Sequence, residues 1–185
     1  FWEEPRGYAA SRGSRRITSR ADCREGRMSL IYLYSHDGDG LGHLRRNLNI
    51  AQTVTRKMPR ASCLMLTGSV FPGAFGTPER CDFVKIPTLS KTDENEYASP
   101  LSTLSGDVAS KIRERMLESV VQHIPPDILI VDKHPQGLSG ELLPALRWLR
   151  KHSPKTQIVL GLRDILDEPS RVEEEWRRNH IPQTL

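Results

Sequence analysis

Residues 29–52, SLIYLYSHDGDGLGHLRRNLNIAQ, decide the fold of this chain. The first seven form a short apolar run rich in residues that favour β-strands, which predicts a strand over residues 29–35. The run stops at the letters DGDG, residues 37–40, and from His43 onward apolar residues recur at helical spacing. This spacing predicts a helix over residues 43–57. A strand, a glycine-rich turn and a helix are the opening of a βαβ unit.

The same alternation continues along the chain. Further strands are predicted over residues 62–66, 82–86, 127–131 and 156–160, and further helices over residues 104–123, 140–152 and 168–179. The apolar positions of the helix 104–123 include Val108, Ile112, Met116 and Val120. Residues 88–104 form a polar loop, expected at the rim of the domain. Strands separated by helix-length segments predict an α/β fold with a Rossmann-like parallel sheet and helices on both faces.

The bulk composition fits one soluble globular domain. The chain has 185 residues, of which 37% are hydrophobic and 27% charged, and no apolar run approaches the ~20 residues needed to span a bilayer. The three cysteines, Cys23, Cys63 and Cys81, are widely spaced and never in a CxxC arrangement. Such usage argues against a disulfide framework or a structural zinc site and fits a cytoplasmic protein. Cys63 and Cys81 are therefore expected to be buried small hydrophobic residues.

Most of the net charge of +4 lies in residues 1–27, where seven Arg face four acidic residues, so residues 28–185 carry only about +1. A nearly neutral folded domain argues against nucleic-acid binding. Residues 1–27 are an Arg- and Ser-rich tail without helical or strand periodicity, and we expect this tail to be disordered. Met28 is either the natural start of the protein or the first residue after a functional basic arm.

The glycine-rich turn excludes two common phosphate-binding loops. A Walker loop needs Lys-Ser/Thr after its last glycine, where this chain has His43-Leu44. The dinucleotide fingerprint requires an acidic residue at the end of the second strand, but that strand ends in Thr67-Gly68-Ser69. What remains is a turn in which Gly38, Gly40 and Gly42 let the backbone approach a ligand at the start of a helix.

A family resemblance rests on this turn and three later segments. Residues 35–52 resemble the first loop and helix of GT-B glycosyltransferases related to the MurG family, in particular a bacterial group of predicted, MurG-like glycosyltransferases. The other similar segments are residues 127–137 (DILIVDKHPQG), 140–149 (GELLPALRWL) and 160–169 (LGLRDILDEP). The resemblance implies that residues 28–185 are the amino-terminal, acceptor-side half of a GT-B fold, without the donor-binding domain.

The resemblance also implies a catalytic pair. His43 corresponds to the loop histidine that deprotonates the acceptor hydroxyl, and Asp132, at the end of a buried strand, corresponds to the carboxylate that orients it. Taken by themselves, the residues leave two alternatives open: a His43 that only caps its helix, and an Asp132 that only ties a loop by hydrogen bonds. His36 and His134 are competing candidates on the same rim.

Several other residues are expected to bind substrate. Arg45 and Arg46 stand near a helix start, where the helix dipole does not favour a cation, which suggests an anionic neighbour such as a substrate phosphate; a solvated helix face is the alternative. His134 and the glycines Gly38, Gly40 and Gly42 complete this set. His36, Asp37, Asp39 and His43 also admit a metal site, but the family chemistry implies neither a metal nor another cofactor. His123, His152 and His180 close helices and are expected to meet carbonyl groups there.

The expected activity is hexosyl transfer from a nucleotide-sugar to an acceptor hydroxyl. Because no donor domain follows, we expect either a truncated product or one half of a split enzyme that meets a separate donor-domain subunit. If the acceptor is lipid-linked, the protein would lie at the inner membrane face. The alternatives are a non-catalytic binding or assembly module of the same fold and a protein similar to sugar-nucleotide epimerases.

Overall fold

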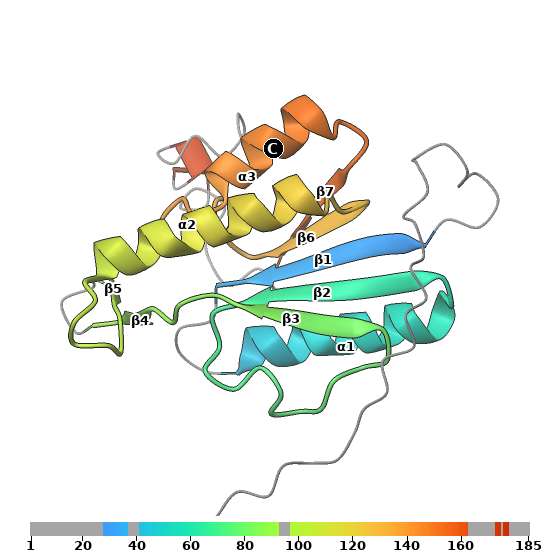
Figure 1. Ribbon diagram of the computed structural model, residues 1–185, viewed down its shortest axis with the longest axis horizontal. Coiled ribbons are helices and arrows are strands. Elements are labelled where there is room, and N and C mark those ends of the chain that lie inside the picture. Colours follow the sequence, from blue (N-terminus) through green and yellow to red (C-terminus); the bar gives the residue numbers. More distant parts are fainter. Residues whose placement is uncertain (1–27, 37–40, 93–96, 163–172, 175, 178–185) are drawn as a thin grey trace, which may run out of the picture.

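The computed structural model describes residues 28–36, 41–92, 97–162, 173–174 and 176–177. Its centre is a five-stranded sheet of order β3-β2-β1-β6-β7, in which every neighbouring pair is parallel (Figure 1). The strands are β1 (Ser29–Ser35), β2 (Ala61–Thr67), β3 (Cys81–Lys85), β6 (Ile128–Asp132) and β7 (Gln157–Gly161). The predicted strand boundaries differ from these by one residue at most.

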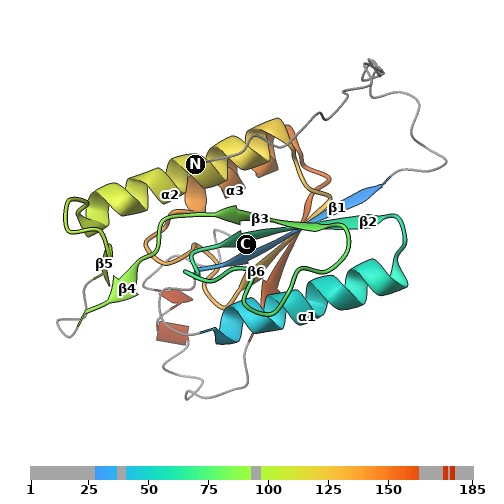
Figure 2. The ribbon, with the colours of Figure 1, turned by 60° about the horizontal axis from the view of Figure 1, so that its bottom comes forward.

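Three helices cover the sheet. Helix α1 (Gly42–Lys57) lies on one face, and α2 (Gly106–His123) and α3 (Leu143–His152) lie together on the other (Figures 1 and 2). The predicted class, an α/β fold with a Rossmann-like parallel sheet and helices on both faces, is therefore confirmed.

The central strand β1 shows why the fold has two cores. Successive side chains of a strand point to opposite faces, so Ile31 and Leu33 pack with Leu44 of α1, whereas Tyr32 and Tyr34 pack with residues of α2 and α3. Both faces of β1 are thus buried, as its continuous apolar run requires.

The buried face of α2 does not follow the four apolar positions named from the sequence. Its apolar positions Val108 and Ile112 are exposed, and the face turned to the sheet consists instead of Ala109, Arg113, Leu117 and Val121. This stripe is offset by one residue and contains a charged side chain. The apolar pattern was ambiguous because apolar residues occupy both stripes, and only the position of the sheet selects the buried one.

Two segments differ from their predicted structure. The predicted helix at residue 140 begins only at Leu143, because Gly137 and Gly140 have positive φ angles of 80° and 81° that turn the chain. Pro144 lies at the start of the helix, as expected. The predicted loop 88–104 contains two short antiparallel strands, β4 (Ser90–Lys91) and β5 (Tyr97–Ala98).

The remaining predictions concern two helix-terminal histidines, the cysteines and segments that the structure does not describe. His123 and His152 place Nδ1 at 2.8 and 3.1 Å from the Ser119 and Trp148 carbonyl oxygens, as expected. Cys63 is buried, but Cys81 is partly exposed because β3 is an edge strand; both are free thiols. The tail 1–27 and His180 lie outside the described residues, as does most of the predicted helix 168–179. Across the described part of the chain, no helix is long and apolar enough to cross a membrane.

Candidate active site at the carboxyl edge of the sheet

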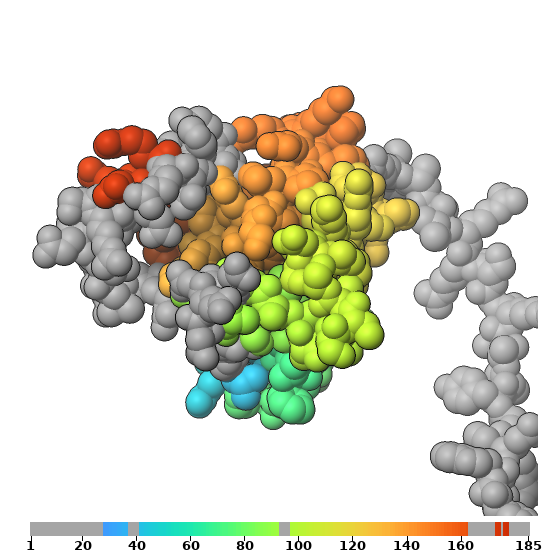
Figure 3. All heavy atoms as spheres, turned by 90° about the vertical axis from the view of Figure 1, so that its left-hand side faces the viewer, coloured from blue at the N-terminus to red at the C-terminus, as the bar shows by residue number. Residues whose placement is uncertain are grey.

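The carboxyl ends of β1 and β6 lie side by side, because these strands are direct neighbours in the sheet. His36 follows β1, and Asp132 is the last residue of β6, so their loops open at the same edge. Figure 3 looks onto this edge and shows the start of α1 (cyan), the residues after β6 (light orange) and the segment leading into α2 (yellow-green) on one face. Ligands of open parallel sheets bind at this edge.

Two of the predicted residues are in direct contact. His43 Nδ1 lies 2.6 Å from Asp132 Oδ2, although 89 residues separate them in sequence. The Asp132 side chain is 2% exposed and the His43 side chain 16%. Because a carboxylate only accepts hydrogen bonds, Nδ1 carries the proton, and Nε2 of the neutral ring is left as the basic nitrogen. The arrangement is that of a carboxylate-oriented general base.

Arg46 completes this contact. Its Nη1 donates to Oδ1 of Asp132, so that each carboxylate oxygen has one donor. A buried carboxylate is costly unless it is paired and hydrogen-bonded, and Arg46 and His43 meet both conditions. The anionic neighbour expected for Arg46 is therefore Asp132 itself rather than a substrate phosphate.

His36 and His134 form an imidazole cluster with His43. The His36 ring centre lies 4.8 Å from that of His43 and 4.7 Å from that of His134, with the second pair edge to face. Burial, together with the positive charges that His134 and His43 acquire on protonation, lowers the pKa of His36 from 6.5 to about 4. His36 is thus neutral at neutral pH. Its Nδ1 is buried without a hydrogen-bond partner in the described part of the chain.

A buried ion pair lies beneath this cluster and was missed from the sequence. Arg113 and Glu141 are both fully buried, and Arg113 Nη2 donates to Glu141 Oε1 at 2.6 Å. Tyr34 also donates to Glu141 Oε1, at 2.6 Å. Burial alone raises the pKa of the Glu141 carboxyl, but the Arg113 charge and the hydrogen bonds outweigh it and hold that pKa below its ordinary value. The pattern that could have revealed Arg113 is its place in the stripe with Ala109 and Leu117 at spacing four.

The remaining predicted residues are Arg45 and the three glycines. Arg45 points to the other side of α1, where its guanidinium lies 5.8 Å from the centre of the Phe75 ring. Gly42 begins α1, and a Cβ atom there would meet nothing within 4 Å, so packing does not require glycine. Gly38 and Gly40 lie outside the described residues, with Asp37 and Asp39. Among the residues that are described, no group of three or more His, Cys, Asp or Glu side chains is arranged to hold a metal ion.

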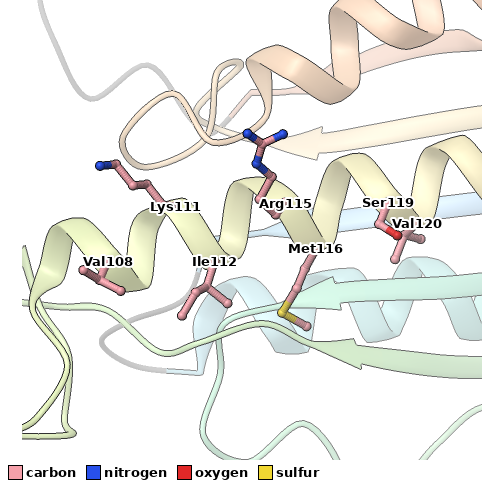
Figure 4. Close-up of a pocket in the computed structure, with 7 residues that line it drawn as sticks. All are labelled: Val108, Lys111, Ile112, Arg115, Met116, Ser119 and Val120. Carbon is pink, nitrogen blue, oxygen red and sulfur yellow. The ribbon is translucent and has the colours of Figure 1, made fainter.

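Another hollow lies elsewhere, along α2. It measures about 510 Å³, and Figure 4 shows its lining, with Lys111 and Arg115 on one side of the helix and Ile112 and Met116 on the other. Neither a histidine nor a carboxylate lines it. Chemistry is therefore better placed at the edge that holds His43 and Asp132.

Comparisons with known proteins find similarity among solved structures alone. No protein-family model matches the sequence, and no curated protein matches it. Among solved structures, a UGT transferase from Siraitia grosvenorii in complex with UDP is 16% identical, with a TM-score of 0.42 over 72% of this chain and 27% of that one. A protein from Listeria monocytogenes described as a UDP-N-acetylglucosamine 2-epimerase is 10% identical, with a TM-score of 0.44 over 83% of this chain and 36% of that one. This chain thus spans about a third or less of the length of either protein.

Proposed function

We propose that this chain is the acceptor-side domain of a two-domain, GT-B-type glycosyltransferase, in which His43 is the general base and Asp132 its orienting carboxylate. The observation that carries the proposal is the 2.6 Å contact between His43 Nδ1 and Asp132 Oδ2 at the carboxyl edge of the sheet. The MurG-like resemblance of residues 35–52 supports the choice of sugar transfer among the reactions that such a pair can catalyse.

The proposed reaction is a single displacement. Nε2 of His43 removes the proton of an acceptor hydroxyl, and the oxygen forms a bond to the anomeric carbon of the sugar donor. The bond between that carbon and the phosphate oxygen breaks, and the nucleoside diphosphate leaves with the bonding electrons. Asp132 stabilises the imidazolium that forms, and the imidazolium then returns its proton to solvent. The step needs no metal or other cofactor.

Arg46 has a positioning role in this scheme. By pairing with the second oxygen of Asp132, Arg46 fixes the carboxylate plane and so the His43 ring. His134 and the glycines Gly38, Gly40 and Gly42 remain proposed substrate contacts at the same edge, and Arg45 remains a proposed substrate contact on the flank of α1. The nucleotide-sugar is proposed to be held mainly by a donor-binding domain, on this or a separate chain, and the acceptor is either soluble or lipid-linked.

Transfer assays on the complete enzyme, this chain together with its donor-binding half, test the pair. Candidate nucleotide-sugars are screened for release of nucleoside diphosphate in the presence of acceptor. His43→Gln is expected to lower kcat by about a hundredfold or more, because the proton acceptor is lost. Asp132→Asn is expected to lower kcat similarly, because an amide favours the wrong imidazole tautomer.

His152→Gln is the matched control, since His152 lies at the end of α3, where it contacts only the carbonyl oxygen and the ring of Trp148 among the contacts described. Near-normal kcat in His43→Gln would rule out His43 as the base. Consumption of the nucleotide-sugar at equal rates with and without acceptor would contradict transferase activity and favour the epimerase alternative.

A further inference from the structure

A second cavity lies on the outer flank of α1, beside the connection between β2 and β3. It measures about 320 Å³ and lies between about two turns of helix, residues 45–52, and one loop, residues 75–78. Its lining residues are Arg45, Leu48, Asn49, Gln52, Phe75, Gly76, Thr77 and Pro78. Its volume is at the lower end of the ~300–1,000 Å³ of small-molecule sites, which suits a ligand with a single ring.

The polar groups of this cavity are suited to hydroxyl groups. Asn49 and Gln52 are both exposed on the helix and each offers an amide that donates and accepts, and Thr77 adds a hydroxyl. A phosphate ion is mainly a hydrogen-bond acceptor and would make little use of the amide oxygens. A ligand with several hydroxyl groups satisfies both the donors and the acceptors.

Phe75 supplies the apolar surface of the cavity. Phe75 is 48% exposed, so a ligand in the cavity can reach its ring. An aromatic face carries partial negative charge and attracts the C–H groups of a ring stacked on it. A sugar ring has such an apolar C–H face and a rim of hydroxyl groups, which matches Phe75 flanked by Asn49, Gln52 and Thr77.

Arg45 indicates that the ligand carries a negative charge. Its guanidinium lies by the Phe75 ring, and none of the other residues that line the cavity carries a charge. No ion pair of Arg45 occurs among the residues described. A ligand with one carboxylate or phosphate group would therefore place that group against Arg45, in a bidentate contact.

Both walls of the cavity are held in place. The loop makes two tight turns, in which Ala74 N donates to the Phe71 carbonyl and Gly76 N to the Gly73 carbonyl, each at 3.1 Å. Arg80, at the end of the loop, donates to the carbonyl of Thr55 on α1 and to that of Ala61 at 3.2 Å. Because these bonds order the walls before a ligand arrives, binding loses less conformational entropy.

We infer that this cavity binds an anionic sugar unit, with the sugar ring on Phe75 and its carboxylate or phosphate on Arg45. Arg45 is two residues from His43 along α1, so the cavity and the candidate active site lie on different sides of the first turns of that helix. Binding of the sugar is independent of the proposed function. The further statement that this sugar is part of the acceptor rests on the proposed function.

The test is an NMR titration of the ¹⁵N-labelled full chain with four probes: glucuronate, glucose 6-phosphate, glucose and inorganic phosphate. At least one anionic sugar is expected to shift the resonances of Gly76, Thr77 and the side-chain amides of Asn49 and Gln52, and to bind more tightly than glucose or phosphate. Comparison of glucuronate with glucose 6-phosphate identifies which anionic group the site takes.

Three variants locate the interaction. Phe75→Ala is expected to weaken binding of the anionic sugar at least about fivefold, in line with the loss of ring stacking. Arg45→Gln is expected to reduce its affinity to that of glucose. Phe71→Ala is the matched control, because Phe71 is 64% exposed on the same loop but does not line the cavity, and it should bind as the parent chain does.

Inorganic phosphate that binds as tightly as the anionic sugars would overturn the inference, as would equal losses in Phe71→Ala and Phe75→Ala, or no shifts at these residues with any probe. His43→Gln should retain binding. Binding without transfer would thus contradict the proposed function alone, and transfer without binding at Phe75 would contradict this inference alone.

Discussion

Asp132 and His36 show how single residues at this edge acquire their chemistry from their surroundings. Asp132 is buried but keeps one donor on each oxygen, His43 on one and Arg46 on the other. His36 is half-buried beside two other imidazoles, and its buried Nδ1 has no hydrogen-bond partner in the described residues. Both oxygens of Asp132 are thus paired, whereas the lowered pKa of His36 keeps its ring neutral at neutral pH.

The lowered pKa of His36 predicts a pH-dependent stability. The pKa of His36 is about 4 in the folded state against 6.5 for the free side chain, so the unfolded chain binds the extra proton first as the pH falls. The free energy of unfolding should thus fall between pH 6.5 and about 4, by up to about 1.4 kcal/mol per pH unit from this residue. His36 faces His43 and His134, with Arg113 and Glu141 beyond.

Urea unfolding of the parent chain and of His36→Asn at pH 7, 6 and 5 measures the contribution of His36 to the pH dependence of stability. The variant should lose less stability over that range, and the exposed His152→Asn should behave as the parent. If the free energy of unfolding changed with pH equally in the parent and in His36→Asn, the pKa of His36 would not be lowered in the folded state.

At the scale of elements, α1 and α2 both begin at a glycine, but the space around these two glycines differs. A Cβ atom on Gly106, at the start of α2, would collide with the carbonyl oxygen of Tyr97 in β5. The same atom on Gly42, at the start of α1, would meet nothing within 4 Å. Glycine is thus required by packing at α2 but not at α1, where only close approach of a ligand would require it.

Gly106→Ala is therefore expected to lower the free energy of unfolding by about 1–3 kcal/mol, through overpacking against a backbone atom. Gly42→Ala should leave stability unchanged or raise it by up to about 1 kcal/mol, because alanine favours helix. Urea unfolding of both variants provides the comparison. Equal destabilisation of the two would contradict the packing argument.

For Gly42, a kinetic measurement adds information about function. If substrate approaches the backbone at this turn, Gly42→Ala should raise KM in the complete enzyme while stability is preserved.

At the scale of the whole molecule, Arg113 joins the loops that follow three strands. Its guanidinium donates to the carbonyls of His36 and Pro87, at 3.3 and 2.7 Å, and to Glu141, whose other oxygen accepts from Ser139 N at 2.8 Å. These bonds connect the residues after β1, β3 and β6 to one side chain of α2. The buried ion pair thus holds the carboxyl edge of the sheet together from below.

Removal of one partner should be strongly destabilising. Glu141→Ala leaves the Arg113 charge buried without its carboxylate, and we expect a loss of about 3–5 kcal/mol in the free energy of unfolding. The double variant Arg113→Met/Glu141→Leu should lose less, because no uncompensated charge remains.

The exposed pair of Arg115 and Glu118 on the same helix, 3.3 Å apart, is the control. Glu118→Ala should change stability by less than about 1 kcal/mol. A loss of similar size in Glu118→Ala and Glu141→Ala, measured by urea unfolding, would contradict the special role of the buried pair.

Much of this arrangement was predictable, for identifiable reasons. The apolar runs at β1 and β6 specify buried strands whose ends differ from the prediction by one residue at most, because each run is bounded by polar or turn residues. The face of α2 was not predictable, since Val108 and Ile112 form an apolar stripe as good as the buried one. The start of α3 was placed three residues early, because the positive φ of Gly140 does not appear in an apolar pattern.

The sequence by itself determined the order of strands and helices, the turn of glycines at the first strand end and the choice of His43 and Asp132 as candidates, because these depend on local pattern and motif. Only the tertiary structure decided which groups meet: Asp132 with His43 and Arg46, Arg113 with Glu141, and Arg45 with Phe75. These pairs join segments between 28 and 89 residues apart. Their contacts depend on strand order and helix rotation, which no local stretch of sequence encodes.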